Sequence, residues 1–333
     1  MRLVVEERHA LSFPDGSPVR AASAVVPFGG GWLVVQDDAT HAAWLRAGTI
    51  EPVRVVAAID GLEVFSEVAG TKHLKPDFEA ACTVTVDGAE AAFLLGSGSS
   101  PARMRASLLR LDADGSPYFV VADLTPAYRA VASAMGLADD QLNLEGACVV
   151  GDRLRWFQRA NVAVGAPSVC ADVELAALLT ATAGPGDSAA GPGGSAAGSA
   201  GSAADPGGFA AGPAGERDPA RFAAGPVRHY DLGRVRGVAL AITDAVPVAE
   251  GLILVSAVAE DTPNAIDDGP VVAAALALLD DFGVRAIAEL PGAPKVEGLA
   301  LIESAGDGAR VMAVVDADDP AAPSERLTLR VTL

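Results

Sequence analysis

The chain has 333 residues, of which 50% are hydrophobic, and its mean hydropathy of +0.33 is sufficient for one large buried core. Its formal net charge of −19 excludes the basic footprint on which nucleic-acid binding depends. The sequence shows no run of eighteen apolar residues and no apolar core of a signal peptide near its start, so we expect a cytoplasmic protein without a membrane span.

An internal repeat organises the sequence. Five segments open with a similar apolar pattern, and further short apolar runs, separated by turn residues, follow each of them. This spacing is typical of four-stranded blades in a radial β-architecture. The openers are SAVV at 23–26, FEAACTV at 78–84, LEGACVV at 144–150, RGVALAI at 236–242 and VEGLALI at 296–302. The predicted fold class is all-β, a five-bladed β-propeller, with a six-bladed ring as the alternative.

In chain order, residues 2–13 precede the first opener. They can supply the missing last strand of the fifth blade, because the chain otherwise ends one strand short and closure removes exposed sheet edges. The first blade follows, and the second is predicted to contain strands at 78–86, 91–98, 102–112 and 117–124. Residues 125–136 lack strand alternation, so a helical turn is expected there.

The third blade is predicted to be interrupted. SVCADVELAALL (168–179) is expected to be its third strand and RHYDLGRV (228–235) its fourth. Between them, residues 181–227 are rich in Gly, Ala, Ser and Pro, which predicts a flexible insertion inside one domain of residues 1–333. The pentapeptide FAAGP occurs twice there, as a docking motif or as a product of repeat slippage. The fourth and fifth blades complete the chain.

The topology predicts which polar residues meet. In an up-and-down blade, the loops before the first strand and the loops after the second strand reach the same mouth of the central channel. The second positions of the five openers are expected there, namely Ala22, Glu79, Glu145, Arg236 and Glu297. The candidate ligand-binding residues at this mouth are Asp37, Asp38, Lys75, Ser97, Ser99, Arg103, Arg105, Gln158, Arg159, Asn161, Arg236, Glu260, Asp261 and Lys295.

The glutamates of the openers have two interpretations. Carboxylates around a narrow channel repel one another, so they need a cation or a proton. If Arg236 is the internal counter-ion, the ring is a structural ion-pair network. If a hard cation such as Ca²⁺ compensates them instead, the metal ligands are Glu79, Glu145, Glu297 and Asp316.

Other loops carry weaker signals. The GSGSS loop (96–100) with Arg103 and Arg105 offers the donors that hold an oxyanion or phosphate, or it is an ordinary turn. The acidic loop 260–269 either binds a cation or is solvated. No catalytic residue is assigned, because no histidine lies in a triad motif and no nucleophile elbow, P-loop or HExxH is present. The three cysteines have no CxxC spacing and are expected to be buried.

The openers LEGACVV (144–150) and VEGLALI (296–302) resemble the [LI]EG[LI]A strand opener of the phytase-like propellers. That group includes proteins described as having esterase-like activity of phytase, and their uncharacterised cytosolic relatives. The resemblance extends to Glu145, Glu297 and, more loosely, Glu79, whereas Ala22 and Arg236 depart from the pattern. It implies an acidic mouth that binds calcium and, in some members, hydrolyses an ester or phosphoester.

The functional expectation combines these observations. We expect a propeller that binds a small anionic molecule or a metal ion at the channel mouth, and its enzymatic form would be a hydrolase of an anionic ester or phosphoester. The alternative is a non-catalytic scaffold that holds a protein partner.

Overall fold

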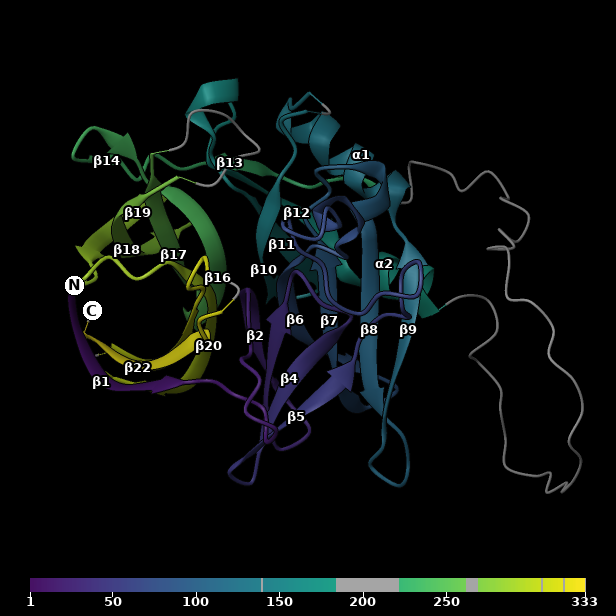
Figure 1. Cartoon of the computed structure of the whole chain (residues 1–333). Coiled ribbons are helices and arrows are strands. Elements are labelled where there is room, and N and C mark those ends of the chain that lie inside the picture. Colours follow the sequence, from purple (N-terminus) through teal and green to yellow (C-terminus); the bar gives the residue numbers. More distant parts are fainter. Residues whose placement is uncertain (139, 184–221, 262–268, 307, 320, 333) are drawn as a thin grey trace, which may run out of the picture.

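The computed structural model describes residues 1–138, 140–183, 222–261, 269–306, 308–319 and 321–332. Within them, five antiparallel sheets of four strands each are arranged as blades of a ring (Figure 1). The innermost strands contact one another in the cyclic order β2, β6, β10, β16, β20 and back to β2. The fold is a five-bladed β-propeller, as predicted, and the six-bladed alternative is wrong.

The strands of each blade follow one another outward from the ring axis. Blade one contains β2 (Ala22–Phe28), β3 (Gly31–Gln36), β4 (His41–Arg46) and β5 (Thr49–Arg54). Blade two contains β6 (Phe78–Val86), β7 (Ala89–Gly96), β8 (Arg105–Leu111) and β9 (Pro117–Asp123). Blade three contains β10 (Leu144–Val150), β11 (Arg153–Gln158), β12 (Val169–Glu174) and β13 (Val227–His229). Blade four contains β16 (Ala241–Ala249), β17 (Leu252–Glu260), β18 (Val271–Asp280) and β19 (Gly283–Glu289).

The N-terminal strand completes blade five. That blade contains β20 (Val296–Ala305), β21 (Gly308–Val315) and β22 (Glu325–Thr332), with β1 (Arg2–Ala10) outermost. β1 pairs with β22 from Arg2↔Thr332 to Ala10↔Glu325, and the two chain ends lie side by side (Figure 1). The predicted closure of the ring is confirmed, and the pairing covers an edge of β22 that would otherwise be exposed.

Two helices flank blades two and three. The predicted helical segment is α1 (Thr125–Met135). Contrary to prediction, the LAALL segment after β12 is not strand but the start of α2 (Leu175–Ala183). Leu and Ala are strong helix formers, and α2 buries Leu178 in the core between the two blades while contacting β8 and β9. None of the helices in the described part of the chain has the length and apolar character needed to cross a membrane.

The predicted insertion is shorter than its composition indicates. Residues 181–183 belong to α2, and residues 184–221 lie outside the described residues, as does the first FAAGP copy. Phe222, the first residue of the second copy, is only 1% exposed and packs in the core between blades two and three. Core packing therefore explains this phenylalanine, and the segment 222–227 is part of the ring.

The start of blade four also differs from prediction. Arg236 and Gly237 form the tip of a hairpin between β14 (Arg234–Val235) and β15 (Val238–Ala239), and the inner strand β16 begins only at Ala241. Both tip residues have positive φ, +52° and +86°, as a two-residue type I′ turn requires. The apolar run VALAI hides this turn, because it continues from the hairpin into β16 without a break in hydrophobicity.

Each inner strand carries a β-bulge near its start. The inserted residues are Ser23, Glu79, Glu145, Thr243 and Glu297. Ser23 and Thr243, and not Ala22 and Arg236, are thus the structural equivalents of the three glutamates. Their hydroxyls donate to the inner strand of the next blade, Ser23 Oγ to the Phe78 carbonyl and Thr243 Oγ1 to the Val296 carbonyl, both at 2.6 Å. At the bulge positions, the serine and threonine side chains thus link neighbouring blades, whereas the three glutamates line the mouth.

Neighbouring inner strands approach each other closely directly after the bulges. A Cβ on Gly298 would lie 2.7 Å from the Cα of Ala24, and a Cβ on Gly146 would lie 3.0 Å from the Cα of Asp244. The inner strands therefore meet backbone to backbone at this level. Asp244 is buried in the same layer, where its Oδ2 accepts the Leu299 N–H at 2.6 Å and burial raises its pKa well above the ordinary value. This layer is the floor of the mouth.

Candidate functional site

A cavity of about 1420 Å³ opens above this floor. Its wall consists of the loops that precede the inner strands and the loops that follow the second strands, as the blade topology predicts. Small-molecule pockets commonly have volumes of about 300–1,000 Å³, so this mouth has room for a small ligand and ordered water.

Fourteen of the eighteen residues predicted from the sequence line this cavity. They are Asp37, Asp38, Lys75, Glu79, Ser99, Arg103, Glu145, Arg159, Asn161, Glu260, Asp261, Lys295, Glu297 and Asp316. The other four, Ser97, Arg105, Gln158 and Arg236, do not line it. Residues 262–268 of the predicted acidic loop lie outside the described residues.

The four other residues have partners within the protein. Gln158 is fully buried, and its side-chain amide binds the backbone of Gln141 and Asn143. Ser97 donates to the carboxylate of Asp77, and Arg105 donates to the carbonyl of Ala102 at 2.5 Å. Arg236 is exposed and donates to the carbonyl of Val272 at 2.8 Å, so it is not the counter-ion of the glutamates. The predicted counter-ion role of Arg236 is wrong because this residue lies at the tip of the β14–β15 hairpin and not at the start of β16.

The first charged group is the Lys75 cluster, which we define as Lys75, Asp37, Asp77, Glu79 and Arg103. The Lys75 ammonium lies 2.5 Å from Asp37 Oδ2, 2.6 Å from Asp77 Oδ1 and 3.6 Å from Glu79 Oε1. Arg103 adds a second cation, 3.1 Å from Asp77 Oδ2. The Asp77 N–H also donates to the carbonyl of Asp37 at 3.1 Å, which fixes the two loops relative to each other.

The carboxyl groups of the Lys75 cluster differ in the direction of their pKa shifts. Burial alone would raise the pKa of Asp77, but Lys75 and Arg103 outweigh it and lower this pKa below the ordinary value. Burial and the charge of Asp37 raise the pKa of Glu79 well above its ordinary value, because Lys75 lies farther from it. The pKa values of two neighbouring carboxyls are therefore displaced in opposite directions.

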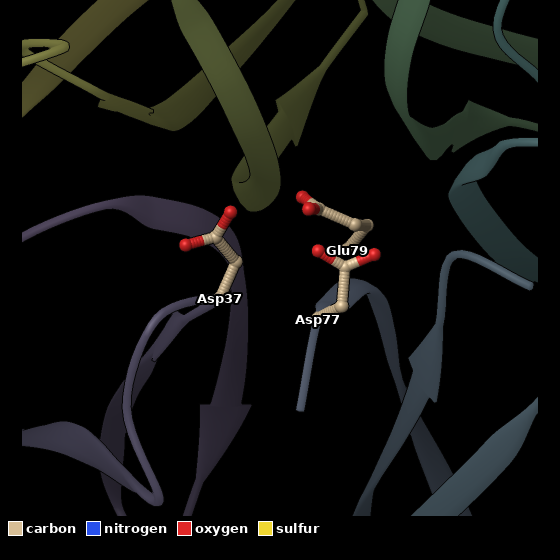
Figure 2. Close-up of side chains that lie close together, drawn as sticks. All are labelled: Asp37, Asp77 and Glu79. Carbon is tan, nitrogen blue, oxygen red and sulfur yellow. The ribbon is translucent and has the colours of Figure 1, made fainter. Parts of the chain in front are cut away.

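The same cluster has the shape of a metal site. Ligand oxygens of Asp37, Asp77 and Glu79 lie within 4.8 Å of one another, and Figure 2 shows the three side chains converging from blades one and two. The Lys75 ammonium, however, already contacts two of these carboxylates at 2.5 and 2.6 Å. The three residues suit a hard cation in kind, but the ammonium takes its place, so this arrangement does not fit a metal.

The second group is the Arg159 cluster, which comprises Arg159, Glu145, Glu260 and Asn143. Arg159 Nη1 donates to both carboxylate oxygens of Glu145, at 2.9 and 3.0 Å, and Nη2 pairs with Glu260. The Asn143 amide donates to Glu145 Oε1 at 2.7 Å. Burial raises the pKa of Glu145, and Arg159 offsets part of this shift. Both glutamates of this cluster have charged hydrogen-bond partners.

The third group is the Lys295 cluster, which comprises Lys295, Glu297, Asp316 and Asp318. The Lys295 ammonium donates to Asp318 at 2.6 Å but lies 3.6 Å from Glu297 and 3.9 Å from Asp316. Glu297 is 7% exposed, and its Oε1 has no hydrogen-bond partner among the described residues. Burial raises the pKa of Glu297 to about 7 and that of Asp316 to about 8. Both carboxylates thus lie beyond hydrogen-bond distance of the Lys295 ammonium.

Two protein families match parts of this chain. The chain matches a family of unknown function, DUF6929, over residues 18–192, which is more than half of its length. The chain belongs to the DUF6929 family. A second family of unknown function, DUF6910, matches residues 193–320. The boundary between the two matches lies between β12 and β13, so in this DUF6929 protein the two families share one blade of a single ring.

None of the curated proteins matches this DUF6929 chain. One similar solved structure is the β-propeller domain of Cps50 (Swd1) from Myceliophteria thermophila, with 9% sequence identity and a TM-score of 0.34. The match covers 91% of this chain and 66% of that one. A thermostable family-43 glycoside hydrolase is also similar, with 9% sequence identity and a TM-score of 0.40; the match covers 97% of this chain and 93% of the hydrolase chain. A protein of unknown function from Dyadobacter fermentans has 10% identity and a TM-score of 0.38, with 99% of both chains covered.

Sequence reasoning missed several lining residues of the DUF6929 protein. Asp77 lies two residues before its bulge, at the position that Asn143 and Lys295 occupy in their blades. This recurring position was a usable signal, but the bulge that defines it is not visible in the sequence. Arg20, which pairs with Asp38, was also missed. Burial and the neighbouring Asp37 raise the pKa of Asp38 to about 6, despite Arg20.

The counter-ions of the glutamates are now assigned. Glu79 faces Lys75, Glu145 binds Arg159, and Glu297 faces Lys295. Each glutamate thus has a cation beside it, and Arg236, predicted for this role, is not among these cations.

Proposed function

We propose that this DUF6929 protein binds a small positively charged ligand in the mouth cavity. The charge balance of the lining supports this proposal: the described lining residues include thirteen Asp or Glu but only seven Lys or Arg. Many of these carboxylates are buried, and each buried charge without compensation costs free energy. A ligand that brings positive charge offsets that cost, and binding is favourable for this reason.

Two kinds of ligand share this chemistry, a hard divalent cation such as Ca²⁺ and an organic ammonium ion. Carboxylate oxygens suit Ca²⁺, which needs six to eight of them. A small anionic ester, as the phytase resemblance implies, is favoured least. The guanidinium groups that would hold an anion, those of Arg103 and Arg159, already bind Asp77, Glu145 and Glu260.

Thermal melting tests the proposal. We expect CaCl₂ or methylammonium chloride to raise the Tm of the full chain above that in NaCl of equal ionic strength, because a ligand that binds only the folded state stabilises it by mass action. EDTA should reverse a calcium effect. Glu145→Gln combined with Glu297→Gln should reduce the response, while Glu303→Gln, on the same strand as Glu297 but 59% exposed, should retain it. If neither cation raises Tm beyond NaCl, the proposal is wrong, and the protein-interaction scaffold becomes the better interpretation.

A catalytic extension is hydrolysis by a carboxyl pair. Asp77 and Glu79 are neighbouring carboxyls of the cavity wall, and the raised pKa of Glu79 suits it as the proton donor of the pair. We propose that they would hydrolyse an ester, and a neutral ester suits the acidic lining better than a phosphoester. Turnover of p-nitrophenyl acetate that Glu79→Gln abolishes and Glu303→Gln leaves unchanged would support this extension. Equal turnover by the wild type and Glu79→Gln would contradict it.

A further inference from the structure

Glu297 and Asp316 mark a specific place in the cavity. Both line it, and Glu297 Oε1 is buried without a hydrogen-bond donor among the described residues. Lys295 does not supply one, since its ammonium contacts Asp318 at 2.6 Å and stays 3.6 Å from Glu297 and 3.9 Å from Asp316. A buried acceptor on a cavity-lining residue, with no hydrogen-bond donor among the described residues, points to a donor from outside the chain.

The Lys75 cluster shows which donor the lining suits. There, one ammonium group contacts two carboxylates at 2.5 and 2.6 Å and lies near a third. An ammonium ion offers three N–H donors and one charge. A bare Ca²⁺ ion beside Glu297 and Asp316 would need several more oxygen ligands and would face the Lys295 ammonium with twice the charge. An external ammonium ion is thus the better match.

The rim of the cavity adds an apolar element. Val68, in the loop between β5 and β6, is 96% exposed, and Val162, in the loop between β11 and β12, is 59% exposed. Both line the cavity. A metal ion makes no favourable contact with apolar side chains, whereas burial of apolar surface against the alkyl part of an organic amine contributes favourable free energy of binding.

We propose that the ligand is an organic ammonium ion with an apolar chain, and that its ammonium group binds Glu297 and Asp316. This inference rests on the proposed function and narrows it to one ligand class and one pair of residues.

Binding of this kind is coupled to proton release. Glu297 faces Lys295, Arg159, Glu145 and Glu260, and Asp316 faces Lys295, Asp318, Asp37 and Glu297. In this environment the pKa values of the pair, about 7 and about 8, leave both carboxyls partly protonated at neutral pH. An ammonium ion binds their ionised forms, so it displaces protons, and its affinity rises with pH until the carboxyls are ionised.

Isothermal titration of the full chain with hexylammonium chloride tests the proposal. We expect proton release at pH 7, measured in two buffers of different ionisation enthalpy, and roughly tenfold tighter binding at pH 8 than at pH 6. Hexanol, the neutral analogue, should not bind, and methylammonium should bind more weakly than hexylammonium. Hexylammonium binding without proton release or pH dependence would overturn the assignment, and this measurement needs no variant.

Substitutions of single residues test whether Glu297 and Asp316 are the carboxyls that bind the ammonium group. Glu297→Gln and Asp316→Asn should each weaken hexylammonium binding at least tenfold, and Glu303→Gln should leave it unchanged. Unaltered affinity in both of the first two variants would overturn the assignment. Calcium binding without hexylammonium binding would overturn this inference but leave the proposed function standing, and binding of neither ligand would overturn both.

Discussion

The Lys75 and Lys295 clusters have the same composition at their centre, one lysine and three carboxylates, yet they differ in how well their charges are paired. Lys75 contacts two carboxylates at 2.5 and 2.6 Å, and Arg103 and Ser97 assist Asp77. Lys295 contacts only Asp318 that closely. The same residue types thus build a self-sufficient ion cluster on one side of the mouth and an under-compensated one on the other.

This difference shows why residue composition alone does not define a binding site. The group that most resembles a metal site, Asp37, Asp77 and Glu79, is already neutralised from within. Glu297, whose Oε1 has no hydrogen-bond donor among the described residues, belongs to the cluster in which we propose an outside ligand. The relevant quantity is the charge left over after internal pairing.

The largest expected effect is that of removing the lysines. Lys75→Met should lower the free energy of unfolding by about 3–5 kcal/mol, because it removes the ammonium group that contacts the carboxylates of both Asp37 and Asp77. Lys295→Met should cost only about 1 kcal/mol, because Glu297 and Asp316 can take up protons instead. Urea unfolding at pH 7 measures both, with Glu303→Gln, whose side chain is 59% exposed, as the control. Equal losses for Lys75 and Lys295 would break the comparison.

The next effect is that replacing two aspartates by asparagine should change the free energy of unfolding in opposite directions. Asp77→Asn should destabilise the fold by about 2 kcal/mol, because it removes an ionised partner of Lys75 and Arg103. Asp316→Asn should instead stabilise it slightly at pH 9, where the wild type must ionise a carboxyl that burial disfavours. Chemical denaturation of both variants at pH 9 decides the matter, and destabilisation by Asp316→Asn would show that its charge is well paired.

A smaller effect concerns pH. The pKa values of Asp38, Glu297 and Asp316 are raised to about 6, 7 and 8. Between about pH 4 and pH 8 the folded protein therefore binds more protons than the unfolded chain, so stability is highest at the acid end of this window and is lost as pH rises through these values. The Tm should fall by a few degrees from pH 5.5 to pH 9, and less in the Glu297→Gln, Asp316→Asn double variant. A Tm that rises over this range would contradict the raised pKa values.

The smallest expected effect is that of Arg236→Ala. The side chain is exposed on the β14–β15 hairpin and makes one hydrogen bond to a backbone carbonyl, so the free energy of unfolding should change by less than about 0.5 kcal/mol. Ligand binding should be unchanged as well. A loss comparable to that of Lys75→Met would restore Arg236 as a counter-ion of the mouth.

Much of the fold could be predicted because its determinants are local. The repeat of apolar openers defines the blade count, and the spare strand at residues 2–10 defines the closure, since both depend on strand alternation and turn residues along the chain. Blade topology then brings Glu79, Glu145, Glu297 and their neighbours to one mouth. The tertiary structure agrees with the sequence on each of these points.

Other features depend on pairing between strands, which the sequence does not display. The bulges decide that Ser23 and Thr243, and not Ala22 and Arg236, align with the glutamates, and cross-strand register alone reveals a bulge. The hairpin before β16 is hidden inside a continuous apolar run. Both errors come from treating position in the sequence as position in the ring.

The sequence by itself determined a closed five-bladed ring with an acidic mouth. Only the tertiary structure decided which cation neutralises which carboxylate, because ion pairing acts over a few ångströms between loops of different blades, as for Lys75 with Asp37 and Arg159 with Glu260. It also decided that Glu297 Oε1 has no hydrogen-bond donor among the described residues, since the Lys295 ammonium donates to Asp318 and stays 3.6 Å away from Glu297. Desolvation and charge depend on the whole surroundings of a group, and those surroundings exist only once the ring has closed.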